Sequence, residues 1–95
     1  MSVVIVGGNE CMVRQYIDLC RRYRCHAKVF CKMHDGLKKQ VGRPDLLILF
    51  TNTTSHKMVR CALSGVKGQP VSIARSHSSS MNALRSILDT HLGVV

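Results

Sequence analysis

The chain has 95 residues, enough for one hydrophobic core and too few for two, so we predict a single domain over residues 1–95. Lysine and arginine total 14 against 5 acidic residues, and the resulting net charge of +9 favours an anionic partner. Aromatic residues make up 4% of the chain, which leaves little ring surface for stacking nucleic-acid bases. An anionic small ligand is therefore favoured over a nucleic acid.

No apolar run approaches the roughly 20 residues of a membrane span. The first residues, MSVVIVGG, carry no basic segment before their short apolar run, so they predict a strand rather than a signal peptide. The cysteines are odd in number and form no CxxC pair: Cys11, Cys20, Cys25, Cys31 and Cys61. This pattern predicts reduced thiols, mostly small core residues, in a cytoplasmic protein.

The first predicted elements are a strand at Val3–Val6 and a helix after it. Gly7-Gly8-Asn9 ends the strand, and Asn9 is a suitable N-cap for the helix. The helix is predicted because apolar residues recur at i, i+3, i+4 and i+7. These residues are Val13, Tyr16, Ile17 and Cys20.

A second strand is predicted at Ala27–Cys31, followed by a loop and a short helix at Leu37–Val41. Gly42-Arg43-Pro44 ends that helix. The third strand, Leu46–Phe50, is continuously apolar, which is typical of a strand that is buried on both faces.

A third helix is predicted from about Ser55, a fourth strand at Pro70–Ala74, and a last helix after the serine-rich loop that begins at Arg75. The third helix is expected to bury Val59, Ala62, Leu63 and Val66. The last helix is expected to bury Leu84, Ile87, Leu88 and Leu92.

Four strand–helix units in succession predict an α/β fold with a parallel sheet and helices on both faces. We expect a small Rossmann-like or flavodoxin-like domain with strand order 2-1-3-4. In such sheets, ligands bind beyond the carboxyl ends of the strands.

The sequence places unusual polar residues at those carboxyl ends. Three of the five histidines follow strands two, three and four, and Arg75 accompanies them. These histidines are His34, His56 and His77. His26 lies at the other end of its strand and His91 lies within the last helix, so both are interpreted as structural. Arg75 and the three histidines predict a binding site at one edge of the sheet.

Each of these residues also has a structural interpretation. Gly7-Gly8 can make a tight turn, and it lacks the third glycine of a dinucleotide-binding fingerprint. Small hydroxyl residues in the later loops are good helix N-caps: Thr54, Ser55 and Ser78. His56 and Arg60 are four residues apart, so they share a helix face that suits a metal-bound group or an anion.

A catalytic role is the weaker interpretation, and no catalytic residue is predicted. Asp35 is the one carboxylate near this edge, which argues against paired-carboxylate chemistry. Cys11 at a helix N-terminus, together with His34, is a conceivable nucleophile pair.

Four segments together resemble a known bacterial family: VVIVGGNECMVRQY, HDG, DLLILFTNTTSHKMVRCAL and PVSIARSHSSSMNAL. The chain resembles the family called domain of unknown function 2325 over nearly its whole length. The matching positions are Gly7, Gly8, His34, Asp35, Gly36, Ser55, His56, Arg75 and Ser76.

The resemblance implies noncovalent binding of b-type haem, linked to oxygen or redox-stress handling. Haem has an apolar face, two anionic propionates and an iron that accepts imidazole. His56 or His34 would ligate the iron, and Ser76 would contact an anionic group. The candidate propionate partners are Arg60, Arg75, Lys38 and Lys39. Met33, Leu37 and Met58 would form an apolar wall, and a homodimer would enclose the cofactor.

Three alternatives remain open. A regulatory module would hold a phosphate or nucleotide on the backbone amides of Asn9 and Ser78, with Arg75 as its ion-pair partner. A basic nucleic-acid-binding protein would depend on the net charge alone. A transition metal would be held by the rim imidazoles His34, His56 and His77.

Overall fold

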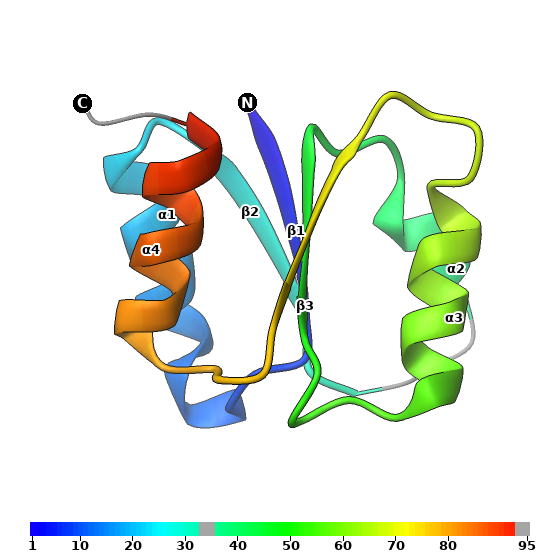
Figure 1. Ribbon diagram of the computed structural model, residues 1–95, viewed down its shortest axis with the longest axis horizontal. Helices are drawn as coiled ribbons and strands as arrows, with labels where there is room; N and C mark the ends of the chain where they lie inside the picture. The colour runs from blue at the N-terminus through cyan, green and yellow to red at the C-terminus, as the bar shows by residue number, and fades with distance from the viewer. Residues whose placement is uncertain (33–35, 93–95) are drawn as a thin grey trace.

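The computed structural model describes residues 1–32 and 36–92, which form one sheet between two layers of helices (Figure 1). The strands are β1 (Ser2–Val6), β2 (His26–Phe30), β3 (Leu46–Phe50) and β4 (Ser72–Ser76). The helices are the 3-10 turn η1 (Glu10–Met12), α1 (Val13–Arg22), α2 (Leu37–Val41), α3 (His56–Gly65) and α4 (Met81–Leu92). Among these described helices, none is long and apolar enough to cross a bilayer.

All four strands are parallel and lie in the order β2-β1-β3-β4, which confirms the predicted fold class and strand order. Parallel neighbours need long crossover connections, and the helices provide them. Helices α1 and α4 cover one face of the sheet, whereas α2 and α3 cover the other (Figure 1). The loops that follow β1, β3 and β4 meet at the lower edge in Figure 1; we call this edge the carboxyl rim.

The core consists of two apolar clusters, one on each face of the sheet. Side chains alternate along the strands, so Ile48 packs towards α1 and α4, whereas Leu47 and Leu49 pack towards α2 and α3. All five residues of β3 are buried, as the continuous apolar run predicts. The central position of β3 therefore follows directly from its composition.

The two edge strands begin and end at residues other than those predicted. β2 starts at His26 rather than Ala27, and β4 covers Ser72–Ser76 rather than Pro70–Ala74. Pairing with β3 sets where β4 begins and ends, because the β4 backbone is paired with β3 from Leu46 to Phe50. An edge strand is partly exposed, so its polar residues hide these limits from a search for apolar runs.

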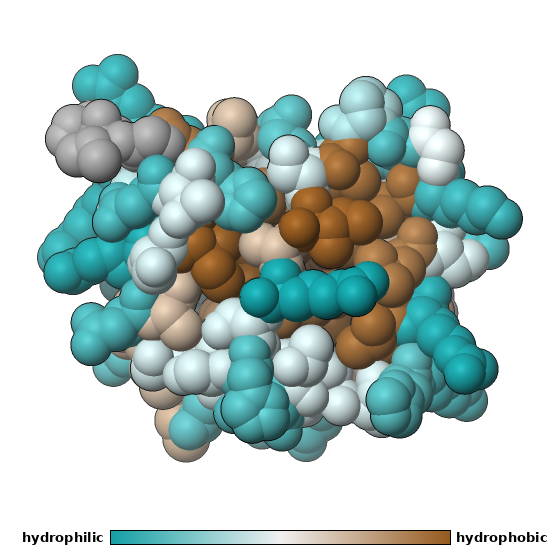
Figure 2. Space-filling view, viewed as in Figure 1, coloured by the Kyte–Doolittle hydropathy of each residue, from teal (hydrophilic) through white to brown (hydrophobic). Residues whose placement is uncertain are grey.

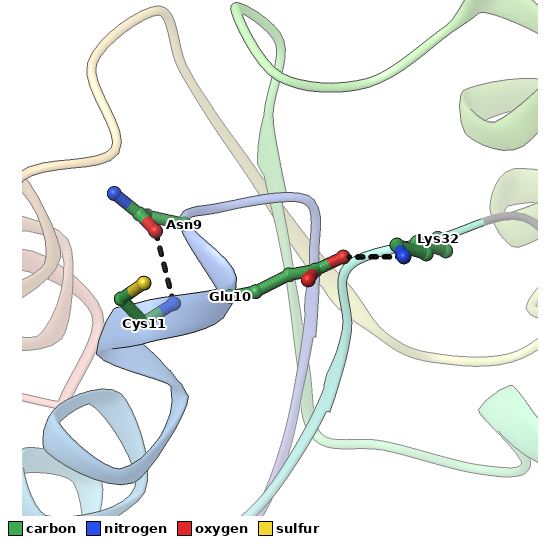
Figure 3. Close-up of polar contacts among 4 residues, drawn as sticks. All are labelled: Asn9, Glu10, Cys11 and Lys32. Atoms are coloured by element: carbon green, nitrogen blue, oxygen red, sulfur yellow. Dashed lines mark hydrogen bonds and ion pairs between the residues drawn. The ribbon is translucent and has the colours of Figure 1, made fainter.

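The connection between β1 and α1 also differs from the prediction. Asn9 caps the 3-10 turn η1, not α1, and its Oδ1 accepts a hydrogen bond from the Cys11 N–H at 2.9 Å (Figure 3). Glu10 forms an ion pair with Lys32, with 3.1 Å between its Oε1 and the lysine Nζ. This contact ties the loop after β1 to the segment that follows β2 (Figure 3).

Candidate functional site

The glycine pair at the end of β1 is packed against the loop that follows β3. Gly7 and Gly8 have φ angles of +97° and +93°, a region that favours glycine. A Cβ atom on Gly7 would lie 2.6 Å from Thr54 Cγ2 and 2.9 Å from the Phe50 carbonyl oxygen. The space beside Gly7 is therefore filled by the protein itself, which removes the simplest form of a glycine cradle for phosphate.

The threonines after β3 hydrogen-bond to nearby backbone groups. The Gly8 N–H donates to Thr53 Oγ1 at 2.6 Å, and that hydroxyl donates to the Phe50 carbonyl at 3.1 Å. Thr54 Oγ1 donates to the same carbonyl at 3.3 Å. The change from an apolar strand to small polar residues is explained by these bonds, which join the loops after β1 and β3.

The hydroxyl of Tyr16 joins two further loops of the carboxyl rim. Its ring is fully buried beside Phe50, with 5.6 Å between the ring centroids. The Tyr16 hydroxyl donates to the Ser79 carbonyl at 2.6 Å and accepts from the Asn9 N–H at 3.2 Å. The Asn9 amide, one of the two predicted phosphate donors, is therefore already used within the protein.

Tyr16→Phe should lower the free energy of unfolding by about 1–3 kcal/mol, because two backbone groups lose their hydrogen-bond partner while the ring remains. Urea denaturation followed by circular dichroism would measure the change. Tyr23→Phe is the control, since the Tyr23 hydroxyl donates to Asp89, away from the rim. A stability equal to that of the parent would show that the Tyr16 hydroxyl does not hold the loops together.

Serine hydroxyls serve as helix caps and loop contacts. Ser55 Oγ accepts from the Met58 N–H at 3.2 Å, as predicted for a cap of α3. At α4, Ser80 accepts from the Ala83 N–H, whereas Ser78 accepts from the Ser80 N–H. Ser78 therefore supports the capping residue of α4 and is not the cap itself.

The residues predicted to ligate iron and bind anions are distributed over different parts of the fold. His56 is the first residue of α3, and Arg60 follows it by one turn; both side chains are exposed. His34 lies outside the described residues. Lys38 and Lys39 are exposed on α2, and Lys39 lines a hollow beside Lys28 on the β2 edge. The predicted set is therefore divided between two edges of the sheet.

Arg75 lies on the same side of the sheet as α3. Ile73 lines a hollow of about 570 Å³ together with Leu63 and Lys67, and Arg75 is two residues further along β4. Alternate residues of a strand share a face, so Arg75 projects to the α3 side of β4. Figure 2 shows apolar surface gathered here, between β4 and α3. His56 and Arg60 precede Leu63 by seven and three residues, so they share its side of α3. We call the surface made by these residues and the hollow the α3–β4 face; it comprises His56, Arg60, Leu63, Lys67, Val71, Ile73 and Arg75.

Ser76 lies on the opposite side of β4. Ala74 packs against α4, so Ser76, two residues later, shares that face. Its hydroxyl donates to the Ser78 carbonyl at 2.7 Å, and its own carbonyl accepts from the Thr51 N–H at 2.8 Å. Arg75 and Ser76, expected to act together on an anion, thus project from opposite faces of one strand.

Two residues of the predicted apolar wall are part of the core. Leu37 is 0% exposed and Met58 is 2% exposed, so the expectation that they border a ligand was wrong. Both pack beneath α2 and α3 because their spacing places them on the sheet-facing side of these helices. The half-buried Val71 and the exposed Ile73 of the β4 edge provide the accessible apolar surface instead.

Burial makes three of the cysteine thiols harder to deprotonate than a free thiol. Burial raises the pKa of the Cys20 thiol to about 12, with the neighbouring Cys25 adding to this effect. Burial also raises the pKa of Cys25 and of Cys31. Within residues 1–32 and 36–92, no three histidine, cysteine or acidic side chains are grouped to hold a metal ion. The His34 half of the predicted nucleophile pair lies outside those ranges.

Comparison with known proteins identifies a family and nothing more. A family model described as "Uncharacterized protein conserved in bacteria (DUF2325)" matches residues 2–91. No curated protein matches the chain. No solved structure matches it either. The match covers every strand and nearly all of α4, so the chain belongs to the bacterial family called domain of unknown function 2325.

Proposed function

We propose that the protein is a cofactor-binding module, not an enzyme, and that its α3–β4 face binds noncovalent b-type haem. The observation that carries the proposal is the meeting of three chemistries on one surface. His56 and Arg60 are exposed on the side of α3 that Leu63 shares, and Leu63 lines the hollow with Ile73. Arg75 is exposed two residues after Ile73 on the same face of β4, so an imidazole, two guanidinium groups and an apolar strip border one side of the sheet.

The dimensions of this surface favour a large flat ligand over a phosphate ion. Leu63 lies two helical turns after His56, about 10 Å along the helix axis. A single phosphate group cannot contact both the imidazole and the apolar strip at that separation. A haem has an apolar plane, an iron that accepts imidazole, and carboxylates that pair with arginine.

The charges of the α3–β4 face are available for an anionic ligand. Within residues 1–32 and 36–92 the single ion pair is that of Lys32 with Glu10, so Arg60 and Arg75 have no acidic partner there. Arginine binds carboxylates in a two-point geometry, which suits propionate groups. Lys38 and Lys39 belong to α2, so in this proposal they are peripheral contacts at most.

A second copy of the chain would cover the free side of the cofactor. The hollow beside Ile73 is open, and this side chain is 42% exposed. One such surface contacts one side of a planar group, so we propose that a homodimer encloses it. Bound haem iron would supply redox and gas-binding chemistry, which fits a role in oxygen or redox-stress handling.

Haemin titration tests the proposal directly. The parent protein should give a saturating Soret band, and His56→Ala should weaken binding by at least about tenfold, since even outer partners of metal ligands affect affinity this strongly. His77→Ala is the matched control, because His77 is another exposed histidine at the carboxyl rim. Visible absorption measures both variants.

Two results would contradict this assignment. A spectrum of free haemin at every protein concentration would discard haem as the ligand. Equal binding by the parent and His56→Ala would remove His56 as the ligand, and a parallel titration of Arg75→Ala would then show whether the face takes part at all.

A further inference from the structure

The outer strand β2 presents a row of polar and aromatic side chains on the α2 side of the sheet. His26, Lys28 and Phe30 alternate along the strand and therefore share one face. Phe30 packs against the core cluster beneath α2, which places this row on the α2 side. His26 and Lys28 are exposed.

Two surface hollows run along this row and share one residue, Lys28. The first, of about 360 Å³, is lined by Lys28 and Phe30 from β2 and by Lys39 and Gln40 from α2. The second, of about 560 Å³, is lined by Lys28, His26 and Asp45 near the amino end of the sheet. Lys28 borders both, so the two hollows adjoin along β2, and we call them together the β2 groove.

The β2 groove is positively charged at its α2 end. Lys28 and Lys39 are exposed and have no acidic partner among residues 1–32 and 36–92. Of the described residues, Asp45 is the one carboxylate that lines the groove; it lies at the other end, where it accepts a hydrogen bond from the Ser2 N–H at 2.7 Å. Two lysines from separate elements therefore flank a half-buried phenylalanine, and no carboxylate of the described residues lines the hollow beside them.

We propose that the β2 groove binds single-stranded nucleic acid. The ring of Phe30 is held by the core and also lines the groove, so it offers a fixed platform on which one base stacks. Lys28 and Lys39 pair with the phosphates on either side of that base. Bases in a duplex are already stacked on each other, so a single strand is the form that satisfies the ring and the lysines together.

This site is independent of the α3–β4 face. β2 and β4 form the two opposite edges of the sheet, so a ligand in the β2 groove does not occupy the cofactor surface. The composition of the chain favours a small ligand over a nucleic acid, since aromatic residues are few. The structure adds that one of these few rings lies between two lysines that have no acidic partner within residues 1–32 and 36–92.

The test uses fluorescence anisotropy of a labelled oligothymidylate with the full chain at low salt. Lys28→Ala/Lys39→Ala should raise the dissociation constant about tenfold or more and reduce the slope of log K against log salt by about 1.4. The matched control is Arg14→Ala/Arg85→Ala, which removes the same charge from exposed residues of α1 and α4. This control should change the dissociation constant less than about threefold.

A second variant tests the ring. Phe30→Leu keeps an apolar side chain against the core and removes the stacking surface, so binding should weaken about fivefold or more. Circular dichroism melting confirms that each variant is folded before binding is compared.

Three outcomes would overturn the proposal. Equal losses of affinity in the lysine and arginine double variants would show that the net charge of the protein attracts the oligonucleotide and that the β2 groove is not a specific site. Competition by poly-glutamate as strong as that by unlabelled oligothymidylate would indicate an acidic polypeptide as the partner. Absence of binding at low salt would exclude nucleic acid altogether.

Discussion

Phe50→Ala should lower the free energy of unfolding by about 3–5 kcal/mol, the usual range for a phenylalanine removed from a core. Phe50 is fully buried at the end of the central strand, and its ring contacts that of Tyr16. Its loss leaves a cavity beneath three loops of the carboxyl rim, whose hydrogen bonds hold the neighbouring backbone in place and limit collapse.

Urea denaturation followed by far-ultraviolet circular dichroism measures this effect, since the chain has no tryptophan for fluorescence. Ile73→Ala is the control, because this apolar side chain is 42% exposed in an edge strand. If Phe50→Ala does not fold, Phe50→Leu gives a smaller and measurable loss. Equal effects of Phe50→Ala and Ile73→Ala would contradict the packing described for the rim.

Gly7→Ala should destabilise the protein by about 2–5 kcal/mol, because strain at a positive φ adds to the cost of overpacking. The added methyl group would press on Thr54 Cγ2 at 2.6 Å and on the Phe50 carbonyl oxygen at 2.9 Å. The backbone oxygen cannot move without disturbing the end of β3. Thermal or urea unfolding of the variant gives the value.

Gly68→Ala separates the two contributions. Gly68 also has a positive φ, +82°, but a Cβ atom there meets nothing within 4 Å. The difference between the two variants is therefore the cost of the contact alone, about 1–3 kcal/mol. Equal losses in both variants would mean that the loop after β3 yields easily and that the glycine pair is free to accept a ligand.

The fold could be predicted from the sequence where burial on both faces leaves a clear apolar pattern. β3 begins and ends as predicted because each of its residues is buried. β4 was placed two residues too early, since the exposed Ile73 and Arg75 obscure the pattern. Hydrogen bonding to β3 determines the extent of β4, and that information lies in a partner strand rather than in the local sequence.

The candidate site could be predicted only as a list of residues near one edge. Alternation along β4 separates Arg75 from Ser76, and this depends on register, which the misplaced strand concealed. The sequence does not reveal that the Tyr16 hydroxyl joins two loops, because the helical spacing of Tyr16 already accounts for it as a core residue. Lys28 and Lys39 border the same hollow because of the way α2 packs beside β2. The local sequence of neither element shows that these two lysines lie close together.

The central place of β1 restricts the order in which this protein acquires its structure. Val3 pairs with Ala27 on one side and with Leu46 on the other, 24 and 43 residues later in the chain. Pairing β1 with β3 closes the longer loop and costs more chain entropy, so we expect this central pair of strands to form late in folding. Until then β1 has an open edge and uncovered apolar faces, so the emerging chain is most prone to aggregate before β3 has been synthesised.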